Sequence, residues 1–283
     1  MPDTSFSEHV CKSCNNSFVG YYCNICGEKV IEAKDRKFKS FLGTVLIATT
    51  FVDNKFIKSL WSTIRNPGFL SREYVDGKRV NYMRPLQMFF ILNLVYFLFP
   101  VLQMFNSTLR TQMYVLPHQK IARDLVLAKV KMEHLDLGGF GLMYNEKTTS
   151  YAKLLVVVFI ILASLPLSLI FMKKNRYFTD HVALSVELTS FNLAVNAIGL
   201  TVLFWIINKV LRLLSIDASY LNDLTLTIIF VSTNLYFLFR AAQTFYNQQG
   251  KLLVIKALLG IFGLFLALET YRFILFFITI WSL

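Results

Sequence analysis

One stretch, residues 65–105, constrains the fold of this chain most strongly. It begins with the basic, turn-rich run RNPGFLSREYVDGKRVNYMRP and continues directly into LQMFFILNLVYFLFPVLQMF. The second part is twenty residues long and apolar enough to cross a bilayer, whose hydrocarbon core is about 30 Å thick. Basic residues that flank a span mark the cytoplasmic side. We therefore expect the chain to be anchored in a membrane here.

The overall composition is that of a multi-pass membrane protein. Apolar residues make up 55% of the 283 positions, and charged residues only 16%. The formal net charge of +12 fits segments that face the cytoplasm and its anionic lipids better than it fits nucleic acid. The first forty residues lack the apolar core of a signal peptide, so we expect the N-terminus to stay in the cytoplasm.

Four cysteines near the N-terminus form two CxxC pairs. They are Cys11, Cys14, Cys23 and Cys26. Two such pairs offer four thiolates to one tetrahedral metal, and Gly27 can take the positive φ that turns backbone N–H groups toward them. We predict a structural zinc ribbon over residues 1–30, with Phe18, Tyr21 and Tyr22 as its core. Two disulfides are the alternative, which would need an oxidising compartment.

Residues 31–85 are expected to connect the ribbon to the membrane. After a charged linker at 31–39, apolar residues recur every three to four positions over 38–64, which predicts an interfacial amphipathic helix. The turn at Asn66-Pro67-Gly68 should end it. Beyond this turn lie four basic candidates for contact with anionic lipids or a partner, or for a plain positive-inside anchor: Arg72, Lys78, Arg79 and Arg84.

We predict an all-α membrane protein with a five-helix transmembrane bundle over residues 86–283. The spans are expected at about 86–105, 154–172, 182–207, 222–239 and 252–270. Beyond residue 270 the apolar run exceeds the bilayer thickness, so it tilts, re-enters or lies in the interface. Five spans with the N-terminus inside leave eighteen Lys and Arg inside and nine outside.

The longest connection, residues 106–150, is expected to be an external loop. It contains a short helical seam at Ile121, Leu125, Ala128, Met132 and Leu135. The run Gly138-Gly139-Phe140-Gly141 should then act as a flexible break. In the last span we expect a packing seam of small residues that includes Gly260 and Gly263, and an ion pair between Glu269 and Arg272.

Polar residues inside the predicted spans are the candidates for an interior polar path. They are Glu187, Asn192 and Asn196 in the third span, with Asp223 and Asn234 in the fourth. Glu187 lies only about 8 Å into its span by helical rise. A carboxylate that reaches back to the interface is therefore the alternative reading of that residue.

The N-terminal third resembles an uncharacterised bacterial family of multi-pass membrane proteins. The likeness covers about residues 11–105. It rests on the CxxC…CxxCG ribbon and on residues of the basic segment: Pro67, Gly68, Tyr74, Gly77, Lys78, Arg79, Tyr82 and Pro85. It implies a domain of unknown function in a bacterial inner membrane. The later segment YFLFRAAQTFYNQQGKLLVIKALL is similar to five-span proteins of the Yip type, which act in membrane trafficking.

These features favour a membrane scaffold or adaptor that is not an enzyme. Its cytoplasmic zinc ribbon would recruit a protein partner close to the anionic leaflet. The alternative is a channel, pore or transporter that uses the interior polar residues; a nucleic-acid sensor lacks the expected Arg and aromatic interleaving. No catalytic residue is assigned, because the chain contains no G-x-S-x-G, H-E-x-x-H or phosphate-binding glycine loop. A homo-oligomer is compatible with both main hypotheses.

Overall fold

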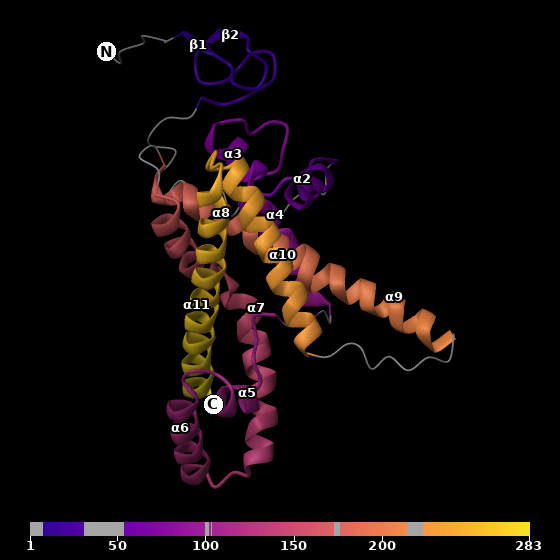
Figure 1. The fold of residues 1–283 in the computed structure, drawn as a ribbon, viewed down its shortest axis with the longest axis vertical. Coiled ribbons are helices and arrows are strands. Elements are labelled where there is room, and N and C mark those ends of the chain that lie inside the picture. The colour runs from indigo at the N-terminus through magenta and orange to yellow at the C-terminus, as the bar shows by residue number, and fades with distance from the viewer. Residues whose placement is uncertain (1–7, 31–53, 100–101, 103, 173–175, 214–222) are drawn as a thin grey trace.

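The computed structural model describes residues 8–30, 54–99, 102, 104–172, 176–213 and 223–283, and it is mostly helical. A small two-stranded sheet of β1 (Glu8–Val10) and β2 (Ser17–Val19) lies at one end of an elongated molecule. The short helices α5 (Leu109–Tyr114) and α6 (Gln119–Met132) lie at the other end (Figure 1). Long helices run between the two ends.

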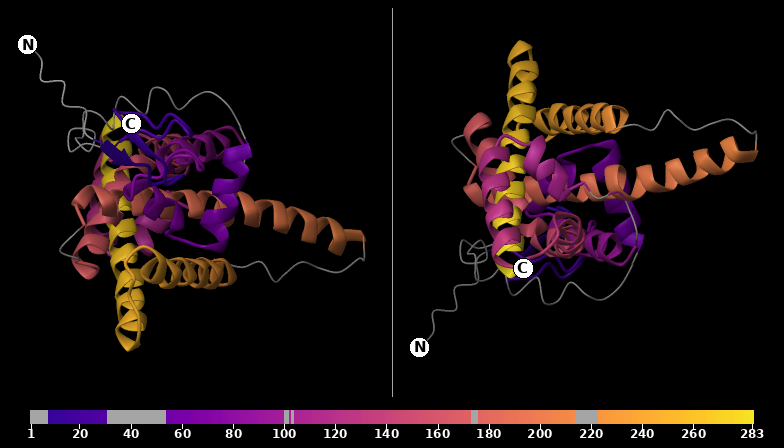
Figure 2. Two further views of the ribbon diagram at one scale, coloured as in Figure 1. Left: turned by 90° about the horizontal axis from the view of Figure 1, so that it is seen from above. Right: turned by 90° about the horizontal axis from the view of Figure 1, so that it is seen from below.

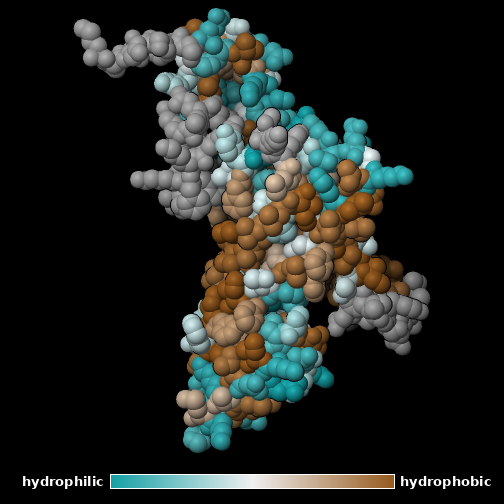
Figure 3. Space-filling view, turned by 60° about the vertical axis from the view of Figure 1, so that its left-hand side comes forward, coloured by the Kyte–Doolittle hydropathy of each residue, from teal (hydrophilic) through white to brown (hydrophobic). Residues whose placement is uncertain are grey.

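Among the described residues, four helical stretches are long and apolar enough to cross a membrane. They are α7 (Leu137–Ile170), the continuous stretch Phe178–Leu211, α10 (Asp223–Thr244) and α11 (Lys251–Ser282). The second stretch comprises α8 (Phe178–Phe191), the π-helix η2 (Asn192–Gly199) and most of α9 (Leu200–Leu213). On the face shown in Figure 3, hydrophobic surface gathers over the middle of the molecule, and hydrophilic surface is more frequent toward both ends. This pattern is that of a membrane protein.

The predicted first span is not confirmed, because its helix is short. Helix α4 covers Pro85–Leu98, which is about 21 Å of helix, and Pro85 occupies its first position as expected. Beyond α4 the backbone N–H of Leu102 donates to Thr201 Oγ1 at 2.9 Å. The Phe105 ring is buried against Tyr96. The described residues that follow α4 are therefore non-helical at 102, 104 and 105, and Leu102 and Phe105 contact other parts of the protein. Packing of this kind is what irregular backbone requires inside a membrane.

The last predicted span is longer than expected. Helix α11 continues without interruption from Lys251 to Ser282, about 48 Å, so residues 271–282 extend the same helix. Its glycines pack closely on neighbouring helices: a Cβ at Gly263 would lie 2.5 Å from Pro166 Cβ of α7. The expected small-residue contact is thus present, and Arg272 Nη1 pairs with Glu269 Oε1 at 3.0 Å as expected.

The predicted 106–150 loop is largely helical. Helices α5 and α6 pack with α7 and the end of α11 in a separate apolar cluster around Phe140, Tyr144 and Phe276. The Gly138–Gly141 run lies in the first turns of α7 and is no break, because Asp136 Oδ2 accepts hydrogen bonds from the N–H groups of Gly138 (3.0 Å) and Gly139 (3.2 Å).

Helix α2 (Asn54–Arg65) overlaps the end of the predicted interfacial helix, whose most apolar part, 41–52, lies outside the described residues. One face of α2 turns inward, with Ser59 and Thr63 fully buried. The other face exposes Ile57 and Trp61. The predicted interfacial amphipathic helix therefore stays a prediction. From above, α9 extends away from the other helices (Figure 2).

Candidate functional site

The four cysteines come together in the small N-terminal region, residues 8–30, which we call the Cys module. Cys11 Sγ lies 3.4 Å from Cys26 Sγ, and Cys14 Sγ lies 3.6 Å from Cys23 Sγ. All four sulfurs fall within 4.8 Å of one another, and all four cysteines are free thiols. Tetrahedral thiolates around zinc are about 3.8 Å apart. The donor set and its spacing therefore fit one tetrahedral metal ion that prefers sulfur ligands.

The two CxxC pairs form matching turns. In the first, the N–H of Asn15 donates to Cys11 O at 2.8 Å, and in the second the N–H of Gly27 donates to Cys23 O at 2.9 Å. Asn15 (φ 58°) and Gly27 (φ 74°) both have positive φ, which confirms the role predicted for Gly27. The small core is only partly as expected: Phe18 is buried, whereas Tyr21 and Tyr22 are exposed.

The thiols of the Cys module differ in how readily they lose a proton. The backbone N–H of Cys26 is the main cause that lowers the pKa of the Cys23 thiol from 9.0 to about 6. At Cys26, the backbone N–H of Glu28 lowers the pKa, but burial and the neighbouring cysteines outweigh it and raise the pKa to about 12. A divalent cation bound by all four sulfurs would remove this conflict.

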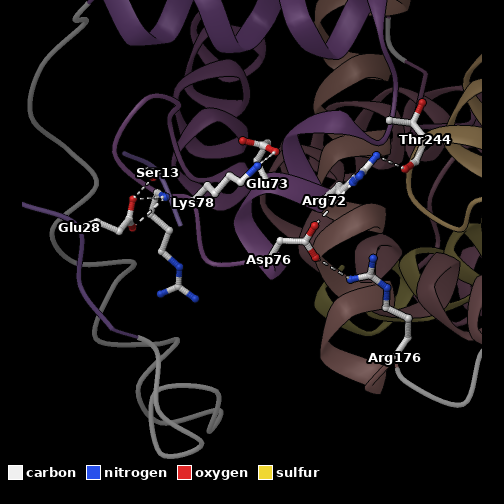
Figure 4. Close-up of polar contacts among 9 residues, drawn as sticks. Ser13, Glu28, Arg72, Glu73, Asp76, Lys78, Arg176 and Thr244 are labelled. Carbon is white, nitrogen blue, oxygen red and sulfur yellow. Dashed lines mark hydrogen bonds and ion pairs between the residues drawn. The ribbon is translucent and has the colours of Figure 1, made fainter. Parts of the chain in front are cut away.

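Glu28 attaches the Cys module to the segment that precedes α4. Its carboxylate accepts hydrogen bonds from the backbone N–H groups of Arg79 (3.0 Å) and Val80 (3.2 Å) and from Ser13 Oγ (2.6 Å). Figure 4 shows Glu28 turned toward Ser13 and this segment. Only 5% of Glu28 is exposed. The contact is therefore a buried, charge-assisted connection rather than a surface ion pair.

A second carboxylate, Glu187 of α8, holds the other end of the same segment. It is fully buried and accepts hydrogen bonds from the N–H groups of Gly68 (3.0 Å) and Ser71 (2.7 Å). Ser71 Oγ also donates to Ala183 O at 3.0 Å. These donors belong to the first turn of α3 (Phe69–Val75), where a negative charge is favoured.

Gly68 is needed for this contact. Its φ is 82°, in the left-handed region, and an added Cβ would lie 2.9 Å from Ala241 Cα of α10. A residue with a side chain would have to strain the backbone and push α10 away. The run Asn66-Pro67-Gly68 therefore ends α2 as predicted, and it also lets the chain approach two membrane helices closely.

The four basic residues predicted for lipid or partner contact are engaged within the protein to different degrees. Arg72 lies 3.6 Å from Asp76, and Lys78 lies 3.3 Å from Glu73 (Figure 4). Arg79 stacks on the Tyr74 ring at 4.5 Å. Arg84 precedes α4, and its N–H donates to Gln87 Oε1. Lipid or partner contact by these residues stays a prediction.

Segments far apart in the sequence meet at this end of the molecule. Arg176, in the connection between α7 and α8, lies 3.6 Å from Asp76. Arg72 donates to Thr244 O at the end of α10 (Figure 4). The basic segment, the α7–α8 connection and the end of α10 therefore lie at the same end of the molecule.

The asparagines predicted to line a polar path bind one another. Asn192 and Asn234 form a reciprocal pair, each Nδ2 lying 2.9 Å from the other Oδ1. Asn196 Nδ2 donates to Asn192 Oδ1 at 2.8 Å, and Thr233 Oγ1 donates to Asn196 Oδ1 at 3.0 Å. The cluster ties η2 to α10, while Glu187 lies apart from it. The Asp223 side chain is outside the described residues.

Sequence reasoning missed Glu28 and the bonding partners of Glu187. The signal for Glu28 was its position directly after CxxCG, where one turn ends against neighbouring chain. For Glu187 the signal was the Pro-Gly turn followed by Ser71, a helix start with free N–H groups. Nothing in the sequence connects Glu187 with its two donors, because Gly68 and Ser71 lie 119 and 116 residues away from it.

Comparison with known proteins finds a match to one part of the chain. A family model described as "Protein of unknown function (DUF3667)" matches residues 53–97. That interval contains α2, the Gly68 turn, α3 and most of α4, so it includes the backbone groups that bind both carboxylates. No curated protein and no solved structure matches the chain. The similarity thus singles out the segment between the Cys module and the bundle and assigns it no activity.

Proposed function

We propose that this protein is a scaffold or adaptor of the bacterial inner membrane, whose cytoplasmic Cys module holds zinc and recruits a protein partner. One observation carries the proposal. Segment 68–80 is held at one end by Glu187 of a membrane-capable helix and at the other by Glu28 of the Cys module. Such a connection keeps a small domain at a defined place above the bundle, which is what a docking platform requires.

The surface of the Cys module supports a role in binding protein. In a region of only 23 residues, five large apolar side chains are more than half exposed: Val10, Val19, Tyr21, Tyr22 and Ile25. Val10 and Val19 lie on the outward face of the hairpin, since the inward pair is His9 and Phe18. Exposed aromatic and aliphatic groups on a rigid module are typical of protein interfaces.

The transport alternative has less support. The amides of Asn192, Asn196 and Asn234 donate to and accept from one another across two helices. Glu187 is occupied by two backbone N–H groups. Polar groups that satisfy one another in this way stabilise helix packing and offer no free ligands to a passing ion.

Site-specific photocrosslinking in intact membranes tests the adaptor proposal. A crosslinking amino acid is placed at Tyr22 of the Cys module or, as the matched control, at Tyr114 of α5; the two positions are exposed by 63% and 53%. We expect one soluble protein to be captured from Tyr22 and not from Tyr114. Capture should be lost when Cys11→Ser and Cys14→Ser are added, because the module then loses its metal.

Two results would contradict the proposal. One is capture of the same proteins from both positions, which would indicate chance encounters. The other is capture from Tyr22 that survives loss of the cysteines, which would separate partner binding from the folded module. Flux of ions through vesicles that contain the purified protein, abolished by Asn192→Ala, would favour the transport alternative instead.

A further inference from the structure

An open groove of about 630 Å³ lies between the C-terminal end of α2 and the last turns of α10. Three of its seven lining residues are cationic and none is acidic. The lining consists of Lys58, Trp61, Ser62, Arg65, Asn66, Tyr82 and Arg240. These cations differ from the four basic residues that the sequence singled out, and they converge on one concave surface from two separate helices.

Two of the three cations of the groove contact neutral groups that hold them in place. Arg240 Nη2 donates to Asn66 Oδ1 at 2.9 Å, which fixes the guanidinium at the groove, and Lys58 Nζ lies 4.8 Å from the centre of the Tyr82 ring. Within the described part of the chain, the side chains of Lys58, Arg65 and Arg240 form no ion pair. By contrast, Arg72 and Lys78 nearby face Asp76 and Glu73.

The groove lies at one end of a helix that can cross a membrane. Helix α10 is long and apolar enough to span a membrane, and Arg240 occupies its last turns, before Thr244. One turn earlier, the exposed Tyr236 donates through its hydroxyl to Ile64 O (3.2 Å) and Arg65 O (3.0 Å), which joins the end of α2 to α10. Exposed Trp61 and Ile57 on α2 add the amphipathic groups that prefer the membrane boundary.

We propose that this groove binds the phosphate of an anionic phospholipid, with Arg65 and Arg240 on the phosphate oxygens and Lys58 beside them. Guanidinium groups suit phosphate because their paired N–H donors match two oxygens at once. Basic pockets between helices at a membrane surface are suited to anionic head groups. The proposal assigns α2 a ligand and does not depend on the adaptor function.

Native mass spectrometry of the full chain in detergent tests the assignment. The protein is titrated with phosphatidylglycerol, with phosphatidylcholine of the same chains, and with inorganic phosphate. The test variant is Lys58→Gln with Arg65→Gln, both exposed residues of α2. The matched control is Lys55→Gln with Lys251→Gln, which removes the same charge from exposed positions outside the groove.

We expect bound phosphatidylglycerol to outnumber bound phosphatidylcholine on the unaltered chain. Each basic residue near an anionic surface changes binding by about fivefold, so the groove variant should lose at least about fivefold more phosphatidylglycerol than the control variant. Equal losses in the two variants would mean general charge attraction and would overturn the proposal. Equal retention of both lipids, or saturation by inorganic phosphate without phosphatidylglycerol, would also overturn it.

Discussion

The Cys module and the helical bundle hold segment 68–80 with the same chemical group but are themselves held together by different forces. Glu28 and Glu187 each accept two backbone N–H groups from the segment. The Cys module has one buried aromatic residue and four sulfurs, so we expect a bound metal to supply most of its stability. The bundle around Glu187 has a large apolar core. Removing metal and removing a carboxylate should therefore affect different parts of the molecule.

Metal removal should have the largest effect, confined to the Cys module. A strong chelator, or Cys23→Ser, should unfold residues 8–30, because structural zinc contributes about 10–16 kcal/mol in comparable small domains. Hydrogen exchange followed by mass spectrometry should show complete loss of protection there, with α7 and α11 unchanged. Loss of protection in α11 as well would contradict the separation of the two regions.

Removing the Glu187 carboxylate should destabilise the bundle strongly. Glu187→Ala leaves two buried N–H groups without acceptors, which we expect to cost about 3 kcal/mol and to lower the thermal unfolding midpoint in detergent. Glu187→Gln should cost less, because the amide oxygen still accepts one bond. The matched control is Glu146→Ala, an exposed carboxylate of α7, which should change little. Equal midpoints for all variants would disprove the anchoring role.

Glycine substitutions should change stability in opposite directions. Gly68→Ala should cost about 2 kcal/mol, because its positive φ is strained for alanine and its Cβ would collide with α10. Gly139→Ala, in the first turn of α7, meets no atom within 4 Å and should be neutral or slightly stabilising. The same thermal unfolding measurement compares them. A stabilising Gly68→Ala would show that α3 does not approach α10 as closely as described.

The smallest effect is expected from Glu28→Ala. The Cys module and the helical bundle should both stay folded, since Glu28 is not one of the four cysteines and does not belong to the bundle. The contact itself should weaken by about 1–2 kcal/mol. Amide exchange at Arg79 and Val80 should then speed up by roughly five- to thirtyfold, while protection inside the Cys module persists. Unchanged exchange at these two amides would remove the proposed connection.

Local patterns in the sequence predicted local structure well. The cysteine cluster follows from two short turns, and the Gly260 and Gly263 seam follows from helical spacing on one element.

The predicted seam on α6 was wrong: Ile121 and Leu125 are exposed, while Ala122 and Val126 are fully buried. Small side chains permit the closest helix approach there, which a count of large apolar residues does not reveal.

Features that depend on distant contacts could not be predicted. Gly138 and Gly139 look like a break, but the Asp136 cap and the buried ring of Phe140 begin a helix there. The chain that follows α4 was expected to be helical to residue 105, yet α4 ends at Leu98 and the backbone beyond it bonds to Thr201. In the first case a local cap and the tertiary packing of Phe140 together outweigh the preference of glycine, and in the second a hydrogen bond to a distant part of the chain outweighs the helical pattern.

The central claim is that four thiolates bind one zinc ion in a module fixed to a membrane bundle. Metal analysis of the purified full chain by mass spectrometry tests it most directly. The account predicts one zinc per chain, reduced to background by Cys11→Ser with Cys14→Ser and unchanged by Glu28→Ala. A chain that contains no metal, or one that keeps its zinc after the two cysteines are replaced, would contradict it.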